Sequence, residues 1–273
     1  MPKGLVSIII TTKNSGRTLE KLLVSIKKQT YVQIETILVD NSSTDKTASI
    51  AKKYTDKVFQ KGPERSAQRN FGISKSKGEY LLILDSDMVL EKDVVNECVD
   101  KIKSNPKLGA IIIPERSFGE GFWSAVKAFE RKINEGEAYF EAARFFLKSV
   151  VNEVGGYDEA ITGPEDWDLP QRVAKRYPIG RIKEYINHDE GNHSLMGLAK
   201  KKYYYGLSVH KYLKKQSLSP ISAQTIYLLR PAFYRSWKVL LSHPSLTVGL
   251  IIMLTTETLA GGWGYLIGRL KSE

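Results

Sequence analysis

The chain has 273 residues, of which 42% are hydrophobic, so it can bury the core of one or two domains. Its single cysteine, Cys98, excludes an intrachain disulfide and favours a reducing compartment. The net charge is +11, and residues 199–238 hold nine Lys and Arg residues without Asp or Glu, which suits nucleic acid, anionic lipid, a phosphorylated substrate or a solvated helix face.

The first part of the chain alternates apolar, β-branched runs with helical patterns. Strands are predicted at 6–10, 35–39, 57–59 and 80–84, with helices at 18–28, 46–54 and 66–76 between them. We expect Ser43 or Thr44 to cap the second helix, and the first apolar run is too short for a signal peptide. This alternation predicts an α/β fold with a mostly parallel central sheet flanked by helices.

The second part is less regular. The pattern predicts a helix at 91–104 and strands at 110–113, 144–147 and 180–186, around an aromatic-rich stretch at 122–132. From about residue 195 the chain becomes basic and aromatic, and residues 245–268 contain no Lys or Arg and one acid, Glu257. We therefore expect a catalytic domain at 1–195 and a helical extension at 196–273.

Polar side chains directly follow three of the predicted strands. Thr11 and Lys13 come after the first strand, Asp40 after the second, and Asp85 and Asp87 after the fourth. In a parallel sheet the carboxyl ends of the strands meet at one edge, where α/β proteins bind ligands. We expect these side chains to lie together at that edge.

The Asp85-Ser86-Asp87 turn is a candidate metal site. Two acids separated by one residue point the same way at a strand end, so both can meet a divalent cation that phosphate oxygens and water complete. An ordinary surface turn is the alternative. One element earlier, Arg65 and Arg69 share a helix face and suit phosphate oxygens, with two solvated arginines as the alternative.

A second group of carboxylates, Glu165-Asp166-Trp167-Asp168, follows Pro164. Acidic neighbours or burial near the tryptophan can raise the pKa of a general base in this group. A helix N-terminus, where proline and acids are favoured, is the alternative. His188 is a candidate further ligand for a divalent ion, and His193 is the weaker candidate.

Four stretches occur in order along residues 5–190: VSIIITTKN, ILVDNSSTDKT, RSAQRNFGISKSKGEYLLILDSDM and GGYDE with GPEDWDL. Together they resemble the family 2 glycosyltransferases, which are inverting enzymes with the GT-A type nucleotide-sugar fold. The resemblance implies metal-dependent transfer of a sugar from a nucleotide-diphosphate sugar to an acceptor. The Gln-x-x-Arg-Trp motif of processive members is not matched, because Gln171 is followed by RVAKRY, so we expect transfer of one sugar.

The resemblance also implies roles for individual residues. Asp166 would be the general base that deprotonates the acceptor, and Asp87 and His188 would ligate Mn²⁺ or Mg²⁺ on the diphosphate. Lys13 stands where the family often has an aromatic residue that stacks on the base. The nucleotide sugar would be contacted by Thr11, Lys13, Asn14, Asp40, Arg65, Arg69, Asp85, Ser86 and Glu165.

The C-terminal extension favours membrane attachment. Residues 245–268 are long enough to cross a bilayer at about 1.5 Å per residue, although Glu257 and the glycines at 261, 262 and 264 disfavour a simple span. The basic, aromatic segments 199–215 and 226–241 are typical of helices that lie on anionic lipid, with a soluble helical cap as the alternative.

We therefore expect an enzyme at the cytoplasmic face of the cell membrane, attached peripherally or by one C-terminal span. Its acceptor would be a carbohydrate or a lipid phosphate such as polyprenyl phosphate, and no nucleic acid is expected as a partner. Two other hypotheses are a catalytically inactive nucleotide-sugar-binding protein and a nucleic-acid-binding protein that uses the basic block.

Overall fold

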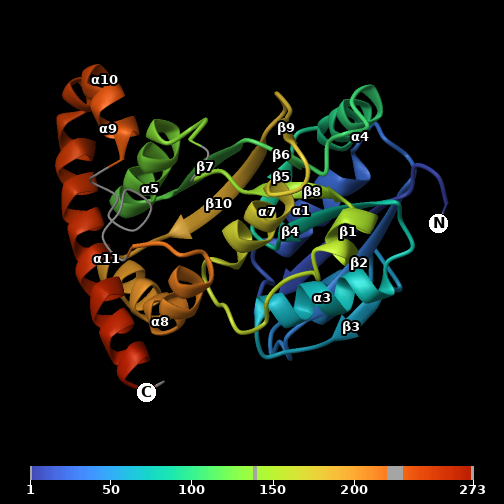
Figure 1. Ribbon diagram of the computed structural model, residues 1–273, viewed down its shortest axis with the longest axis horizontal. Helices are drawn as coiled ribbons and strands as arrows, with labels where there is room; N and C mark the ends of the chain where they lie inside the picture. The colour runs from blue at the N-terminus through green and yellow to red at the C-terminus, as the bar shows by residue number, and fades with distance from the viewer. Residues whose placement is uncertain (1, 138–139, 220–229, 272–273) are drawn as a thin grey trace. The chain divides into compact units, whose positions relative to one another are not determined.

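The computed structural model describes residues 2–137, 140–219 and 230–271. The chain forms two compact units (Figure 1). The first contains Met1–Glu115, Glu141–Glu159 and Glu165–Asp189, and the second contains Arg116–Phe140, Ala160–Pro164 and Glu190–Glu273. Each unit is therefore assembled from segments that are far apart in the sequence.

The first unit is built on a seven-stranded sheet in the order β3-β2-β1-β4-β8-β6-β9. Its strands are β1 (Val6–Thr12), β2 (Ile34–Asp40), β3 (Val58–Gln60), β4 (Tyr80–Asp85), β6 (Ala110–Ile112), β8 (Ala143–Leu147) and β9 (Ile179–Arg181). β1 pairs in parallel with β2 and β4, β2 with β3, and β6 with β9, whereas β8 runs antiparallel to β4 and β6. The predicted α/β fold with a mostly parallel sheet is confirmed.

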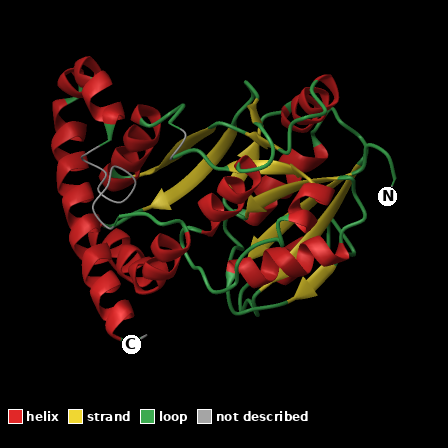
Figure 2. Ribbon diagram, viewed as in Figure 1, coloured by secondary structure: helices red, strands yellow, loops and turns green. Residues whose placement is uncertain are grey.

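Helices cover both faces of this sheet (Figure 2). In β1, Ile8 and Ile10 pack into the core that α1, α2 and α4 share, and Ile9 packs into the core that α3, α6 and α7 share. Successive strand residues point to opposite faces, so only an unbroken apolar run can bury both. The helices are α1 (Leu19–Lys27), α2 (Thr47–Ala51), α3 (Arg65–Lys75), α4 (Val94–Ser104), α6 (Lys148–Glu153) and α7 (Glu165–Ala174).

Residues 180–186 do not form the single strand that was predicted. β9 ends at Arg181, and β10 runs over Ile186–Asn192, where it pairs antiparallel with the short strand β5 (Met88–Leu90). The sequence pattern does not predict β5 or β7 (Glu115–Glu120), and the second sheet has the order β5-β10-β7. These strands are short or polar, so their apolar periodicity is weak.

The predicted cap of the second helix is also wrong. The backbone N–H of Thr47 donates to Asp45 Oδ1 at 2.9 Å, and neither Ser43 nor Thr44 caps α2. The Ser43 hydroxyl instead donates to Asp40 Oδ1, and the Thr44 N–H donates to Asn14 Oδ1. Contacts with the neighbouring loop therefore outweigh the local capping preference.

The described part of the second unit is mainly helical. It contains α5 (Phe122–Ile133), α8 (Leu195–Lys215), α9 (Pro231–Arg235), α10 (Trp237–Ser242) and α11 (Pro244–Leu270), and α5 and α8 pack along α11 (Figure 1). Leu250, Met253 and Leu254 of α11 share a core with α5. By length and composition alone, α11 could cross a membrane. Residues 226–229 of the predicted basic segment lie outside the described residues.

Glycines allow α8 and α11 to approach closely. A Cβ added at Gly264 would overlap the carbonyl oxygen of Tyr203, and one added at Gly268 would overlap the carbonyl oxygen of Leu207. Gly206 of α8 faces Gly261 and Gly264 in the same way. Gly261 and Gly264, two of the three glycines that disfavour a simple membrane span, therefore serve helix packing.

We predict opposite effects for two glycine substitutions on α11. Gly264→Ala should destabilise the protein by roughly 1–3 kcal/mol, because the added methyl group meets backbone of α8. Gly262→Ala should stabilise it by roughly 0.5–1 kcal/mol, because no described atom outside its own helical turn lies within 4 Å of the new Cβ and alanine favours the helix. Urea unfolding of both full-length variants measures this, and equal effects would contradict the packing described here.

Candidate active site

The register of the sheet brings three polar strand ends together. Thr12 at the end of β1 pairs with Asp40 at the end of β2, and Thr11 pairs with Asp85 at the end of β4. The Thr11 hydroxyl also lies 3.4 Å from Asp85 Oδ1. The expected gathering of polar side chains at this edge of the sheet is present in the first unit.

Asp40 anchors the loops that follow β1 and β2. Its buried carboxylate accepts hydrogen bonds from the Thr12 hydroxyl at 2.7 Å, the Ser43 hydroxyl at 2.6 Å and the Ser43 N–H at 2.8 Å. The Asn14 N–H donates to Ser43 Oγ at 2.7 Å, so the two loops are cross-linked. Lys13 and Asn14 remain exposed at the rim.

Arg69 joins the two groups of carboxylates. It projects from α3 with no exposed side-chain surface, and its NH2 lies 2.9 Å from Asp85 Oδ1 while its NH1 lies 2.5 Å from Asp166 Oδ1. The guanidinium carbon lies 5.0 Å from the centre of the Tyr157 ring. A charged side chain that is buried away from water requires oppositely charged partners. Here Asp85 at the end of β4 and Asp166 of α7 supply them.

Arg144 of β8 extends this network. Its Nε donates to Glu115 Oε1 at 2.5 Å, and its NH1 lies 3.6 Å from Asp85 Oδ2. Burial by itself would raise the pKa of Asp85, but Arg69 and then Arg144 outweigh burial and hold that pKa well below its usual range. Asp85 is therefore a carboxylate in the folded protein.

Arg65 and Glu165 form a neighbouring pair. Arg65 NH2 lies 2.8 Å from Glu165 Oε1, and the Glu165 side chain is almost fully buried. Burial raises the pKa of Glu165, against the opposing effect of Arg65. Both arginines of the predicted phosphate-binding face thus contact carboxylates in this structure.

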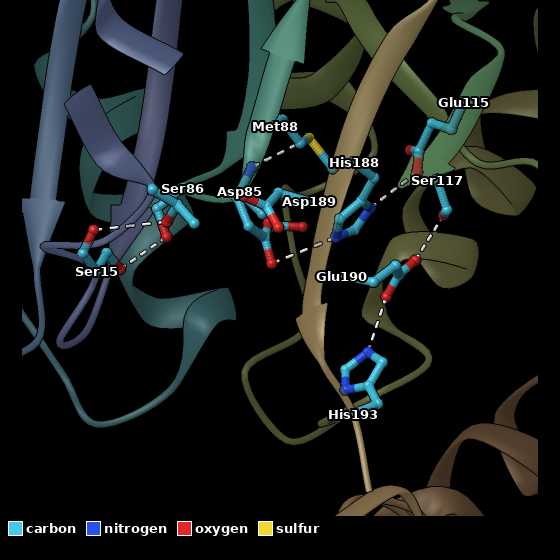
Figure 3. Close-up of polar contacts among 12 residues, drawn as sticks. Ser15, Asp85, Ser86, Met88, Glu115, Ser117, His188, Asp189, Glu190 and His193 are labelled. Atoms are coloured by element: carbon cyan, nitrogen blue, oxygen red, sulfur yellow. Dashed lines mark hydrogen bonds and ion pairs between the residues drawn. The ribbon is translucent and has the colours of Figure 1, made fainter. Parts of the chain in front are cut away.

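The Asp85-Ser86-Asp87 turn lies beside β10. The Ser86 hydroxyl donates to Ser15 Oγ at 2.7 Å (Figure 3), and His188 Nε2 lies 3.3 Å from Asp87 Oδ2. Among the described residues, Asp87 Oδ1 is buried and has no hydrogen-bond partner. His193 instead contacts Glu190 Oε2 through its Nε2 at 3.1 Å.

These residues fit a hard divalent ion. Asp87 offers a carboxylate oxygen without a partner, and His188 offers an imidazole nitrogen close to the same carboxylate. Within the described ranges, no group of three or more His, Cys, Asp and Glu side chains is arranged to hold a metal ion. An ion here would therefore take further ligands from a diphosphate and water, as Mg²⁺ commonly does.

Sequence reasoning missed Glu115, Arg144 and Tyr157. An arginine inside the apolar run ARFFL was a signal, because a charge in a buried strand requires a partner. Glu115 follows a predicted strand, as Asp40 and Asp85 do. Its pairing with Arg144, 29 residues away, depends on tertiary structure.

Comparison with known proteins identifies related sequences. A family model described as "Glycosyl transferase family 2" matches residues 7–156, which is more than half of the chain. Glycosyltransferase GlyG of Streptococcus pneumoniae is 33% identical over 106 residues, covering 36% of this chain and 35% of that protein. Chondroitin synthase of Escherichia coli is 24% identical over 191 residues, covering 66% of this chain and 28% of that protein. The chain thus spans about a third or less of the length of these two relatives.

Solved structures share the fold at low sequence identity. Mannosyltransferase PcManGT from Pyrobaculum calidifontis, in complex with GDP-Man and Mn²⁺, is 17% identical with a TM-score of 0.67, over 98% of this chain and 88% of that chain. S. aureus TarS 1-349 in complex with UDP-GlcNAc is 16% identical with a TM-score of 0.55, over 98% and 91%. This likeness confirms the expected GT-A type fold.

We predict that Asp85 contributes to the acid sensitivity of the fold. Because its folded pKa is lowered, its ion pairs stabilise the protein above the ordinary aspartate pKa of about 3.9, and this stabilisation is lost as the pH falls further. Asp85→Asn should flatten the fall in unfolding free energy below about pH 4 by up to roughly 1.4 kcal/mol per pH unit. Urea unfolding between pH 6 and pH 3 measures the slope. Exposed Asp56→Asn is the control, and equal slopes for both variants would contradict the prediction.

Proposed function

The chain belongs to glycosyl transferase family 2, and from this premise we propose that it moves one sugar from a nucleotide-diphosphate sugar to an acceptor hydroxyl or phosphate. The observation that carries the proposal is the buried network that joins Asp85 and Asp166 through Arg69 in the first unit. It holds a donor-side carboxylate and a candidate base in one fixed arrangement. A single displacement at the anomeric carbon then inverts the configuration.

Asp166 is the proposed general base. Its side chain is 22% exposed, and one of its oxygens is fixed by Arg69 at 2.5 Å. An acceptor hydroxyl can approach the exposed side, lose its proton to the carboxylate and attack the sugar. Arg69 orients the base from the buried side, so this arginine is proposed to act through Asp166 and Asp85 and not through the phosphates.

Asp87 and His188 are the proposed ligands of Mn²⁺ or Mg²⁺. When bound, such an ion would neutralise the charge that develops on the diphosphate leaving group. The partnerless Asp87 Oδ1 and the nearby His188 Nε2 support this assignment. The Mn²⁺ in the PcManGT complex, which shares the fold, supports the choice of metal.

The remaining residues at the rim are proposed to hold the donor. The nucleotide would lie along the loops of Asp40 and Thr11–Asn14, and the diphosphate sugar would lie toward the turn at Asp85 and Ser86. The pair Arg65–Glu165 borders the base Asp166. GDP-Man and UDP-GlcNAc, which the two structural relatives bind, are the first donors to test.

We predict that Asp166→Asn lowers kcat by about 10²–10⁴-fold with little change in the KM for the donor, because it removes the base and keeps the shape. Asp87→Ala should abolish the dependence of the residual activity on Mn²⁺, and EDTA should inactivate the unmodified enzyme. Consumption of donors in a panel of UDP- and GDP-sugars measures both effects. The surface variant Asp56→Ala is the matched control, and activity unaffected by EDTA, Asp87→Ala and Asp166→Asn would refute the mechanism.

Attachment to a membrane is proposed for the C-terminal region. The exposed side of α11 carries one apolar stripe, whose residues recur at intervals that match helical turns: Val248, Ile251, Ile252, Leu259, Trp263, Leu266 and Leu270. Trp237 and Leu241 of α10 are exposed as well. Soluble proteins rarely leave a contiguous apolar patch of this kind uncovered.

The charges of this region favour an anionic lipid surface. Residues 195–271 contain one acid, Glu257, which is buried and lies 3.3 Å from both Lys127 Nζ and Lys202 Nζ. The lysines at 200, 201, 211, 214 and 215 are exposed. Because the lysine-rich α8 packs along α11, we propose that α11 lies on the cytoplasmic face of the membrane and does not cross it.

We accordingly propose that residues 1–195 supply the chemistry and residues 196–273 the attachment. A sugar acceptor held at the same surface would be a lipid phosphate such as polyprenyl phosphate, and a soluble carbohydrate is the other acceptor to test. Neither acceptor is a nucleic acid, so we propose that the basic residues within 199–238 bind lipid.

We predict that the full chain floats with vesicles of phosphatidylglycerol and phosphatidylcholine and does so more weakly at high salt. Trp263→Glu should weaken this binding at least about tenfold, because burial of one large apolar side chain is worth roughly 1.5–3 kcal/mol. Val32→Glu, at another exposed apolar residue, should bind as the unmodified protein does. Equal binding by both variants would exclude the stripe as the attachment site.

A further inference from the structure

His188 lies between two carboxylates in the first unit. Its Nδ1 is 3.3 Å from Glu115 Oε2 (Figure 3). Its Nε2 is 3.3 Å from Asp87 Oδ2. The pairing of β10 with β5 sets His188 opposite Met88, next to Asp87 in the chain. The Asp189 N–H donates to the Asp87 carbonyl at 2.8 Å, which fixes the two strands at this point.

Glu115 is itself held from the other side. Its Oε1 accepts from Arg144 Nε at 2.5 Å, so its two oxygens face an arginine and an imidazole. The side chains of Glu115 and Arg144 are 12% and 8% exposed. A carboxylate buried to this degree between two nitrogen donors has little freedom to turn.

We propose that Glu115 is a positioning residue that orients His188 for the divalent ion, and that Arg144 fixes Glu115 in turn. The inference rests on the proposed metal-dependent function. An imidazole that donates its Nδ1 proton to a carboxylate keeps the lone pair of Nε2 for a metal, and such partners make the imidazole a stronger ligand. Here Nε2 is the nitrogen that faces Asp87.

The same residues connect the metal ligands to the base. From Asp87 and His188, the contacts run through Glu115 and Arg144 to Asp85, and from Asp85 through Arg69 to Asp166. A purely structural Glu115–Arg144 pair would stabilise the fold equally well without His188. Metal affinity and the protonated nitrogen of His188 distinguish the two roles.

The first experiment measures binding of Mn²⁺ alone to the full chain by electron paramagnetic resonance of the free ion. Glu115→Gln should weaken Mn²⁺ binding about 10–100-fold, as loss of such partners does in metal sites. Glu153→Gln is the control, because Glu153 at the end of α6 also pairs with an arginine, Arg176, at 2.6 Å. The control should bind Mn²⁺ as the unmodified protein does.

The outcomes separate the two proposals. If His188→Ala and Asp87→Ala weaken binding and Glu115→Gln does not, the positioning role of Glu115 is wrong and the metal site stands. If none of the three weakens binding, the metal site of the proposed function is wrong, and the inference falls with it.

A second measurement needs no Glu115 variant and therefore survives a folding defect. The chain has four histidines, so the ¹⁵N signals of His188 can be assigned by their loss in His188→Ala. With Mg²⁺ at pH 8, His188 should carry its proton on Nδ1 and none on Nε2. A proton on Nε2 and none on Nδ1 would overturn the inference.

Discussion

The candidate active site depends on the ion pairs of the buried Arg69 guanidinium. Arg69 has no exposed side-chain surface, and it is balanced by Asp85 from one strand and Asp166 from a helix that follows some 80 residues later. Without these acids the guanidinium would be an uncompensated charge in the core, which costs several kcal/mol. The same ion pairs of Arg69 therefore stabilise the first unit and fix the position of the candidate base Asp166.

This requirement explains why the sequence carries two separate groups of acids. The acids at 85–87 follow a central strand, at the edge where α/β sheets bind ligands, and those at 165–166 begin a helix. Both groups also meet a second arginine, since Arg144 lies 3.6 Å from Asp85 and Arg65 lies 2.8 Å from Glu165. In the proposed function, this network holds Asp85 and the candidate base Asp166 at a constant separation.

Much of the first unit could be predicted from the sequence because its central strands are buried on both faces. Apolar runs such as YLLIL leave little alternative to a covered parallel sheet, and the residues after them then gather at one edge. β7 and β10 could not be predicted, because ERSFGE and INHDEGN lack apolar alternation. The partners of Arg69, Arg144 and His188 were beyond sequence patterns, since each pair joins segments that only the folded chain brings together. The family resemblance implies roles for Asp166 and Asp87 but gives no indication of Glu115.

The way α11 is built into the second unit bears on how this protein can be shortened. Its inward side supplies Leu250, Met253 and Leu254 to the core, and Glu257 offsets the charges of Lys127 and Lys202. A chain that stopped before Pro244 would expose that core and remove the carboxylate that Lys127 and Lys202 share. If such a shortened chain behaved differently in a membrane fractionation assay, misfolding would account for the result without any loss of lipid contact. Substitutions on the outer surface of α11 are therefore a better test than its removal.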